Sequence, residues 1–167
     1  MSSPAGPERP PRAADRIKVW FRPAPREGRA PYDTEGLWAT RLGPDTARVD
    51  NAPFLQDGVA EGETVRFRTD ADGVHWAVGR AAGSGNCTVR VLPLPDGPLG
   101  RDAGAVHERL AAYGLTGEVF SADFPLIALT VPGGADLRGV KELLARGRDE
   151  GWWHFEVSCD TDAWRAA

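Results

Sequence analysis

The order of predicted strands and helices in residues 87–158 limits the fold of this chain more than any other feature. Apolar periodicity, capping aspartates and glycine breaks divide the segment into six elements. They are a strand at 87–92, a helix at 102–113, strands at 117–121 and 124–131, a helix at 136–150 and a strand at 152–158. This β-α-β-β-α-β order is that of the split βαβ, or ferredoxin-like, unit. The first and third strands are the most apolar, so we expect them in the centre of the sheet.

Residues 16–83 contain short alternating segments and no helical pattern. Tight turns separate these segments, and Gly73 is the last residue of one such turn, at 70–73. The predicted strands lie at 16–22, 37–42, 47–51, 63–69 and 74–80. Such a series predicts a small curled sheet or partial barrel.

The fold class is therefore α+β, with a β-rich lobe at 16–83 and a ferredoxin-like lobe at 84–160. We expect residues 1–15, which hold four prolines, to be a disordered tail. Residues 161–167 are expected to be a C-terminal tail.

Composition narrows the class of protein. No apolar run approaches the roughly 20 residues of a membrane helix, and no apolar leader segment is visible. The 2 cysteines exclude a disulfide scaffold. Together these features predict a cytoplasmic protein without a membrane partner. Only Lys18 and Lys141 are lysines, and this arginine bias, with abundant Ala, Gly and Pro, is typical of GC-rich, actinobacterial-like genomes.

The formal net charge of −4 disfavours general nucleic-acid binding. One local exception is a basic edge opposed only by Asp15 and Glu27. Its members are Arg16, Lys18, Arg22, Arg26 and Arg29. The edge is either a solvated strand and loop or, with an exposed Trp20, a nucleic-acid contact.

Four sequence pieces carry a family resemblance. They are Glu35-Gly36-Leu37-Trp38, Val49-Asp50-Asn51-Ala52-Pro53-Phe54, Gly58-Val59-Ala60-Glu61-Gly62-Glu63-Thr64-Val65 and Ser84-Gly85-Asn86-Cys87-Thr88-Val89-Arg90. In this order they resemble a bacterial family, domain of unknown function 4265, over about residues 17–158. This chain has Glu63 where the family pattern has Asp, and Cys87 where it usually has Ser. The second difference argues against a thiol mechanism, and the resemblance implies no activity.

An anion site is one interpretation of the segment between the lobes. Successive backbone N–H groups at Ser84, Gly85 and Asn86 can form an anion-binding nest, and the Arg90 guanidinium can add a bidentate fork. A flexible turn explains the same glycines. Asn51 either caps a bend or presents its amide to a ligand.

Acid–base candidates are Glu35, Asp50, His75 and Cys87. Cys87 and His75 would form a thiolate–imidazole pair if their strands meet, although Cys87 is equally a small core residue. The histidines have no metal-ligand spacing and no cofactor motif occurs, so we predict neither metal nor cofactor.

Trp152 and Trp153 should point to opposite faces of the last strand. One of them would then lie on an open sheet face, where Trp152 can contact the first lobe, a ligand or a second copy in a homodimer.

These features lead to three hypotheses. The first is a non-catalytic binding or accessory protein that holds a protein, a peptide or a small anionic ligand between the lobes. The alternatives are a small cofactor-independent enzyme with an interlobe acid–base pocket and a nucleic-acid-binding module.

Overall fold

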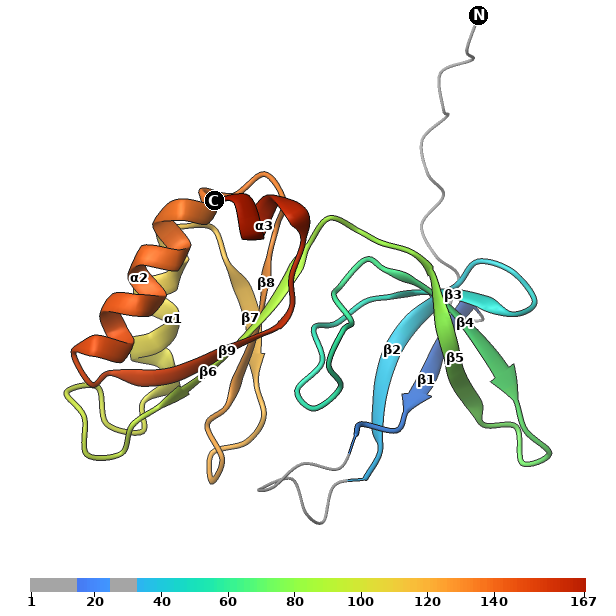
Figure 1. The fold of residues 1–167 in the computed structure, drawn as a ribbon. Helices are drawn as coiled ribbons and strands as arrows, with labels where there is room; N and C mark the ends of the chain where they lie inside the picture. Colours follow the sequence, from blue (N-terminus) through green and yellow to red (C-terminus); the bar gives the residue numbers. More distant parts are fainter. Residues whose placement is uncertain (1–14, 25–32) are drawn as a thin grey trace, which may run out of the picture.

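The computed structural model describes residues 15–24 and 33–167. These residues form a closed five-stranded barrel, a separate four-stranded sheet and three helices (Figure 1). The fold is therefore mixed α and β, as predicted. Most of the predicted disordered tail, and Arg26 and Arg29 of the basic edge, lie outside the described residues.

The barrel is built from the short alternating segments of the first half. Its strands are β1 (Arg16–Phe21), β2 (Glu35–Arg41), β3 (Thr46–Val49), β4 (Thr64–Thr69) and β5 (His75–Ala82). Consecutive strands pair antiparallel, and a parallel pairing of β1 with β5 closes the ring. The predicted partial barrel is thus a complete one.

Alternation along each strand fills the barrel interior. Small Ala39 and Ala47 face larger side chains inside the ring, which suits a barrel of five strands. The interior cluster is Val19, Phe21, Leu37, Ala39, Ala47, Val49, Val59, Val65 and Phe67. The intervening residues point outward, so the outer surface carries the polar and charged side chains.

The second sheet has the strand order β7-β8-β6-β9, and all its pairs are antiparallel. Its strands are β6 (Cys87–Pro93), β7 (Thr116–Val119), β8 (Ile127–Val131) and β9 (Trp153–Cys159). The two most apolar strands, β6 and β8, lie in the centre, as their composition predicts.

Two capped helices belong to this half of the chain. Helix α1 (Ala103–Ala111) begins after Asp102 and helix α2 (Leu137–Asp149) after Asp136, and each aspartate side chain accepts a backbone N–H of the first turn. The expected C-terminal tail is instead a third short helix, α3 (Asp162–Ala166), which buries Trp164. Burial of this indole explains why the end of the chain is ordered.

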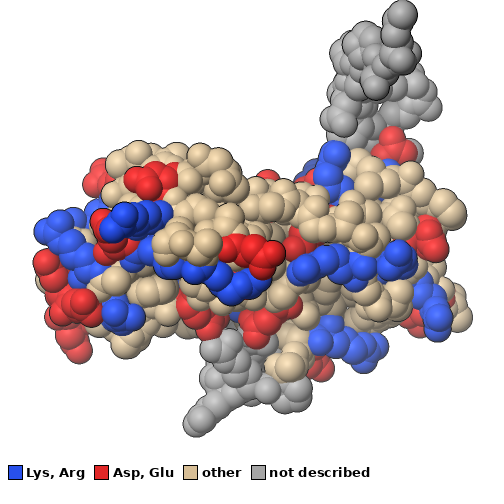
Figure 2. Space-filling model, turned by 45° about the horizontal axis from the view of Figure 1, so that its top comes forward, with Lys and Arg blue, Asp and Glu red and all other residues tan. Residues whose placement is uncertain are grey.

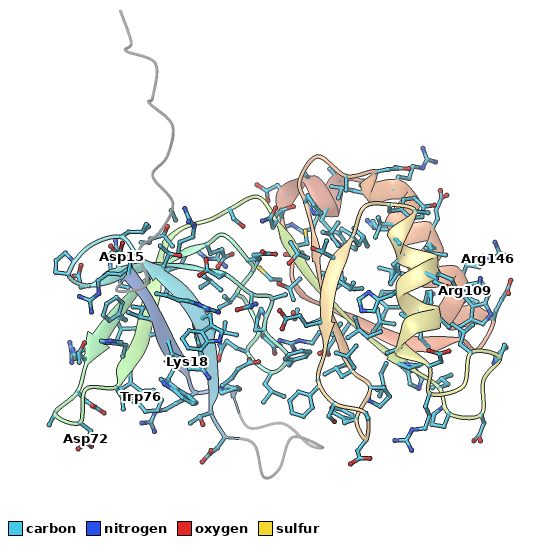
Figure 3. All side chains as sticks on the ribbon, turned by 180° about the vertical axis from the view of Figure 1, so that it is seen from behind. Asp15, Lys18, Asp72, Trp76, Arg109 and Arg146 are labelled. Carbon is cyan, nitrogen blue, oxygen red and sulfur yellow. The ribbon has the colours of Figure 1, made fainter. Side chains whose placement is uncertain are left out.

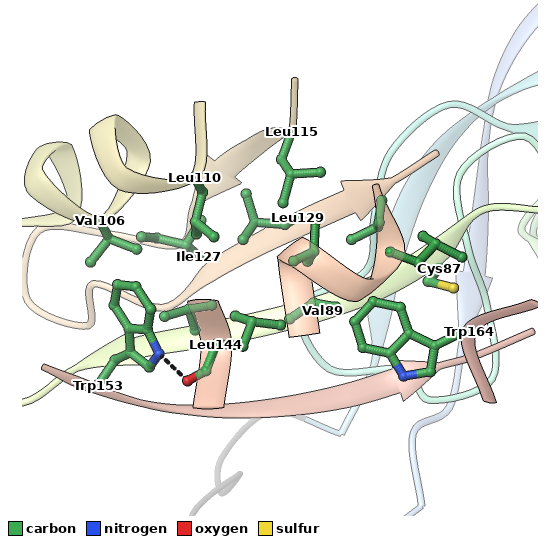
Figure 4. Close-up of a cluster of buried hydrophobic side chains, with 14 of the residues drawn as sticks. Cys87, Val89, Val106, Leu110, Leu115, Ile127, Leu129, Leu144, Trp153 and Trp164 are labelled. Atoms are coloured by element: carbon green, nitrogen blue, oxygen red, sulfur yellow. Dashed lines mark hydrogen bonds between the residues drawn. The ribbon is translucent and has the colours of Figure 1, made fainter. Parts of the chain in front are cut away.

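The helices and the sheet enclose one core (Figure 4). Trp153 is fully buried there and its Nε1 donates to the carbonyl of Leu144, 3.0 Å away. The expectation for Trp152 is wrong. This residue precedes β9 and is buried in the same cluster, with its ring centre 5.5 Å from that of Trp153, so it offers no platform on the other face.

The sheet face opposite the core is not open either. The β3–β4 loop, residues 50–63, lies against it between the two sheets (Figure 1). Thr88 of β6 donates to the carbonyl of Val59 at 2.8 Å, and Thr130 of β8 donates to Glu61 at 2.7 Å. The centre of this face is therefore covered by the first lobe, one of the three contacts that we expected for it.

Gly147 of α2 provides a test of the core. A Cβ at this position would overlap the ring of Trp153. We expect Gly147→Ala to lower the free energy of unfolding by about 1–3 kcal/mol through overpacking. Helix propensity alone would raise stability by about 1 kcal/mol. Chemical denaturation decides between the two, with Arg138→Ala on the exposed side of α2 as the control. A more stable Gly147→Ala variant would contradict the packing.

Candidate functional site

Arg90 lies at the centre of the contact between the barrel and the second sheet. It is only 2% exposed and points to the face opposite Val89 and Val91. Its Nε donates to the carbonyl of Pro53 at 3.1 Å and its Nη2 to that of Gln56 at 2.5 Å. Its Nη1 binds two carboxylates, which belong to Asp57 at 2.8 Å and Glu156 at 3.0 Å. The guanidinium is thus satisfied within the chain.

Glu35 holds the same loop from the other side. It is buried at the start of β2 and its carboxylate accepts three successive backbone N–H groups, from Phe54, Leu55 and Gln56, at 2.7–3.0 Å. Three such donors fix the position of the carboxyl group against residues 54–56. Glu35 therefore positions the β3–β4 loop. This role differs from the acid–base role that we predicted for it.

These contacts use, within the protein, the Arg90 donors that we expected to bind a ligand between the lobes. The predicted anion-binding role of Arg90 is not supported, because its Nε, Nη1 and Nη2 atoms already donate to protein oxygens. The sequence could show that Arg90 points away from the core. It could not show that a loop more than 30 residues earlier supplies the partners.

Arg90→Ala tests this structural role. The substitution takes the Arg90 donors away from the loop carbonyls of Pro53 and Gln56, at about 1–3 kcal/mol each, so we expect the free energy of unfolding to fall by about 2–5 kcal/mol. Arg138→Ala, which removes an exposed ion pair on α2, should change it by less than about 1 kcal/mol. Denaturant titration measures both, and an Arg90→Ala variant as stable as the wild type would contradict the assignment.

A second buried acid lies beside this contact. Glu63 is 3% exposed. Its Oε1 forms an ion pair with Nη2 of Arg80 at 3.2 Å and accepts a hydrogen bond from the thiol of Cys159 at 3.6 Å. Its Oε2 is buried and has no hydrogen-bond partner. Burial raises the pKa of Glu63 despite the opposing charge of Arg80. Burial, reinforced by the Glu63 charge, raises the pKa of Cys159 to about 11, so this thiol is not activated as a nucleophile.

The raised pKa of Glu63 predicts a pH dependence. The folded protein binds this proton more tightly than the unfolded chain, so the contribution of Glu63 to stability is full at low pH and is lost as pH rises through its raised pKa. Glu63→Gln removes the titration. The melting temperature of this variant minus that of the wild type should therefore increase between about pH 4 and pH 7.

Thermal melts over this pH range provide the check. Glu142→Gln on the exposed side of α2 is the control, and its difference from the wild type should be nearly flat. A Glu63→Gln difference that stays constant or falls with pH would show that burial does not control this carboxyl group.

The other ligand-binding candidates also make internal contacts. Asn51 donates to Glu118 of β7 at 3.0 Å, and Asn86 donates to the carbonyl of Glu61 at 2.8 Å. The backbone N–H of Asn86 is bound to the Ser84 hydroxyl, and Gly85 takes a φ of 80° that side chains rarely adopt. The segment is a turn that joins β5 to β6. One of the N–H groups predicted to bind an anion is already used.

The acid–base candidates are dispersed. Asp50 accepts from the Thr40 hydroxyl, His75 contacts the Thr69 hydroxyl at 2.7 Å, and the buried Cys87 lies 3.6 Å from the Thr161 hydroxyl. Within residues 15–24 and 33–167, no hydrogen bond or ion pair joins any two of Glu35, Asp50, His75 and Cys87. The described residues also contain no group of three or more His, Cys, Asp or Glu side chains arranged to hold a metal ion.

The outer surface of the barrel has a different character. Cations and tryptophans alternate across β2, β1 and β5 and contact one another. We call this the cation–tryptophan row, and it consists of Arg16, Lys18, Trp20, Arg22, Trp38 and Trp76. Figure 3 shows Lys18 and Trp76 on the barrel, while Arg109 and Arg146 lie at the helical end of the molecule.

Lys18 connects two rings of the row. Its Nζ lies 5.1 Å from the ring centre of Trp38, its register partner on β2, and 5.3 Å from that of Trp20. The guanidinium of Arg16 lies over Trp38 at 4.3 Å. Gly36 permits this packing, because a Cβ there would come within 2.7 Å of the Lys18 side chain and 3.1 Å of Trp20. Cation–π attraction thus fixes these long side chains on the surface.

The row continues onto β5. Trp76 is the register partner of Trp20, and Arg22 lies 4.1 Å from its ring centre. The indole Nε1 of Trp76 donates to Asp70 at 3.0 Å, and this bond is the main cause of the lowered pKa of Asp70. Asp70 therefore orients the last ring of the row.

Charge on the barrel strands is almost entirely positive. Their residues include seven arginines or lysines, whereas Glu35, which is buried, is their single acid. The cations are Arg16, Lys18, Arg41, Arg48, Arg66, Arg68 and Arg80. Figure 2 shows arginine and lysine atoms in a band over the barrel half of the molecule. The alternation of Arg16, Lys18 and Trp20 was visible in the sequence, but the contributions of Trp38 and Trp76 depend on strand register.

The fold and this surface together define a two-lobed α+β protein with a cationic, aromatic barrel face. The chain belongs to the family described as domain of unknown function 4265, whose model matches residues 35–155. This confirms the resemblance found in the sequence. No curated protein matches the chain. None of the helices in the described residues is both long and apolar enough to cross a membrane.

A solved structure has a similar fold. It is the crystal structure of a hypothetical protein from Neisseria gonorrhoeae, with a TM-score of 0.66 and 14% sequence identity. The similarity covers 86% of this chain and 95% of that one. At this identity the likeness concerns the fold alone.

Proposed function

We propose that this chain is a non-catalytic binding protein that holds a polyanionic ligand on the outer surface of its barrel. The observation that carries the proposal is the charge of the barrel strands, whose seven cations are accompanied by a single acid, the buried Glu35. This moves the ligand from the interlobe space, where Arg90 binds the β3–β4 loop, to the outside of the first lobe.

Unpaired surface cations support an anionic ligand. In the described part of the chain, Arg48, Arg66 and Arg68 of β3 and β4 form no salt bridge. The net charge of −4 therefore results from acids outside these strands, among them Asp45, Asp70 and Asp72 in the turns of the barrel. A concentrated positive surface on an acidic protein attracts anions locally and steers their approach.

The second lobe is proposed to be ferredoxin-like and to serve as a rigid support. Its strand order, its antiparallel pairs and its two capped helices are those expected of the split βαβ arrangement. A cytoplasmic location in a bacterium fits the arginine-rich composition and the two free thiols. A homodimer would have to use surfaces other than the covered sheet face.

The interlobe enzyme has less support. Its four acid–base candidates lie on separate elements and bind other groups, so no pair of them is placed to share a proton. We therefore retain binding as the function.

A matched pair of triple variants tests the proposal. Arg16→Gln, Lys18→Gln and Arg22→Gln together remove three charges from the barrel, and Arg138→Gln, Arg146→Gln and Arg148→Gln remove three exposed charges from α2. Fluorescein-labelled inorganic polyphosphate is the probe, and anisotropy at low salt measures its binding. We expect the barrel variant to bind at least about tenfold more weakly, since each lost charge costs affinity. The α2 variant should bind like the wild type.

Two results would contradict the proposal. One is that the wild type does not bind polyphosphate at low salt. The other is that both triple variants lose the same affinity, because net charge and not the barrel face would then control binding. Melting curves of all three proteins establish that they remain folded.

A further inference from the structure

We infer that the polyanion bound by the barrel is single-stranded nucleic acid, with unpaired bases stacked on the tryptophans and phosphates held by the cations of the row. This inference rests on the proposed function and names its ligand class. It returns to the third hypothesis of the sequence analysis, a nucleic-acid-binding module, and places the contact on the cation–tryptophan row.

The first argument is the presence of rings among the charges. Trp38 is 41% exposed, Trp20 and Trp76 are half-buried, and the neighbouring Val78 is 59% exposed. A ligand of phosphates alone would need only the cations. Exposed aromatic rings placed between cations match the requirements of a nucleotide chain, whose bases stack and whose phosphates carry the charge.

The second argument is the order of the groups across the strands. Arg16 and Lys18 flank Trp38, Lys18 also contacts Trp20, and Arg22 covers Trp76. Each ring therefore has a cation within about one side-chain length. A base that stacks on Trp38 or Trp76 would replace the guanidinium now lying over the ring, and the displaced Arg16 or Arg22 would then bind the neighbouring phosphate.

The third argument concerns the shape of the surface. The row lies on the convex outside of a barrel, and the helices α1 and α2 lie in the other lobe (Figure 3). Proteins that recognise the sequence of a duplex insert a helix or a two-stranded ribbon into one of its grooves. Bases inside a duplex have no free face on which an aromatic side chain can stack. The surface thus favours unpaired over paired nucleic acid.

The tryptophans of the row set the number of stacking positions. The described residues supply three, Trp20, Trp38 and Trp76, and Asp70 holds the last of these rings through its indole N–H. We therefore expect about three bases to stack on the row.

The experiment uses the full chain and a fluorescein-labelled oligo(dT) of ten nucleotides, read by anisotropy. Trp38→Leu removes the most exposed ring of the row. Phe124→Leu is the matched control, because Phe124 is 39% exposed but lies in the second lobe. Labelled polyphosphate, a duplex of the same length and an acidic peptide, poly-glutamate, are the comparison probes.

We expect Trp38→Leu to weaken oligo(dT) binding by about tenfold, the loss of one stacked base, and to leave polyphosphate binding unchanged. Phe124→Leu should bind oligo(dT) like the wild type. Wild-type affinity for oligo(dT) should fall by about twentyfold between 50 and 200 mM salt if three phosphates are neutralised. Quenching of tryptophan fluorescence by oligo(dT), and not by polyphosphate, would accompany binding.

Other outcomes separate the two proposals. If oligo(dT) and polyphosphate bind alike and Trp38→Leu changes neither, the nucleic-acid inference fails while the polyanion function stands. The same holds if the duplex or poly-glutamate binds more tightly than oligo(dT). If no probe binds at low salt, both proposals are wrong.

Discussion

Residues 53–56 of the β3–β4 loop link the two lobes, because the side chains of Glu35 and Arg90 both bind this short segment. The carboxylate of Glu35 accepts the N–H groups at one side of residues 54–56, and the guanidinium of Arg90 donates to carbonyls at 53 and 56. Both charged groups are buried, so each would be costly without this segment. The loop in turn is held by these bonds together with its own apolar anchors, the buried Leu55, Val59 and Ala60. The position of each lobe relative to the other depends on this arrangement.

Alternation in the sequence was sufficient to predict most elements, because it follows from burial on one side of a strand or helix. The high apolar content of β6 and β8 placed them in the centre, and the residue type at the helix starts identified Asp102 and Asp136 as caps. The barrel strands were also predicted to within one or two residues. Closure of the barrel was not, since the pairing of β1 with β5 joins residues more than 50 positions apart.

The candidate site could be predicted less well, for two physical reasons. Arg90 was correctly placed on the polar side of its strand, but its partners come from a loop whose fold no local pattern encodes. Trp152 was assigned to the open face because alternation was extended to it, whereas it precedes β9 and packs with Trp153 in the same core. The cation–tryptophan row required the register between three strands, which the sequence does not show.

The loop between β3 and β4 has a consequence for how the protein comes apart. It is part of the barrel by sequence, yet Thr88, Arg90 and Thr130 of the second sheet obtain their buried hydrogen bonds from it. If the chain were cut between the lobes, these polar groups of the second lobe would be exposed to water. The β3–β4 loop of the first lobe would lose the hydrogen bonds that hold its conformation. Neither half then resembles an autonomous domain, despite having its own apolar cluster. The two lobes should fold and unfold as one cooperative unit, so evolution could not readily exchange either half for an unrelated module.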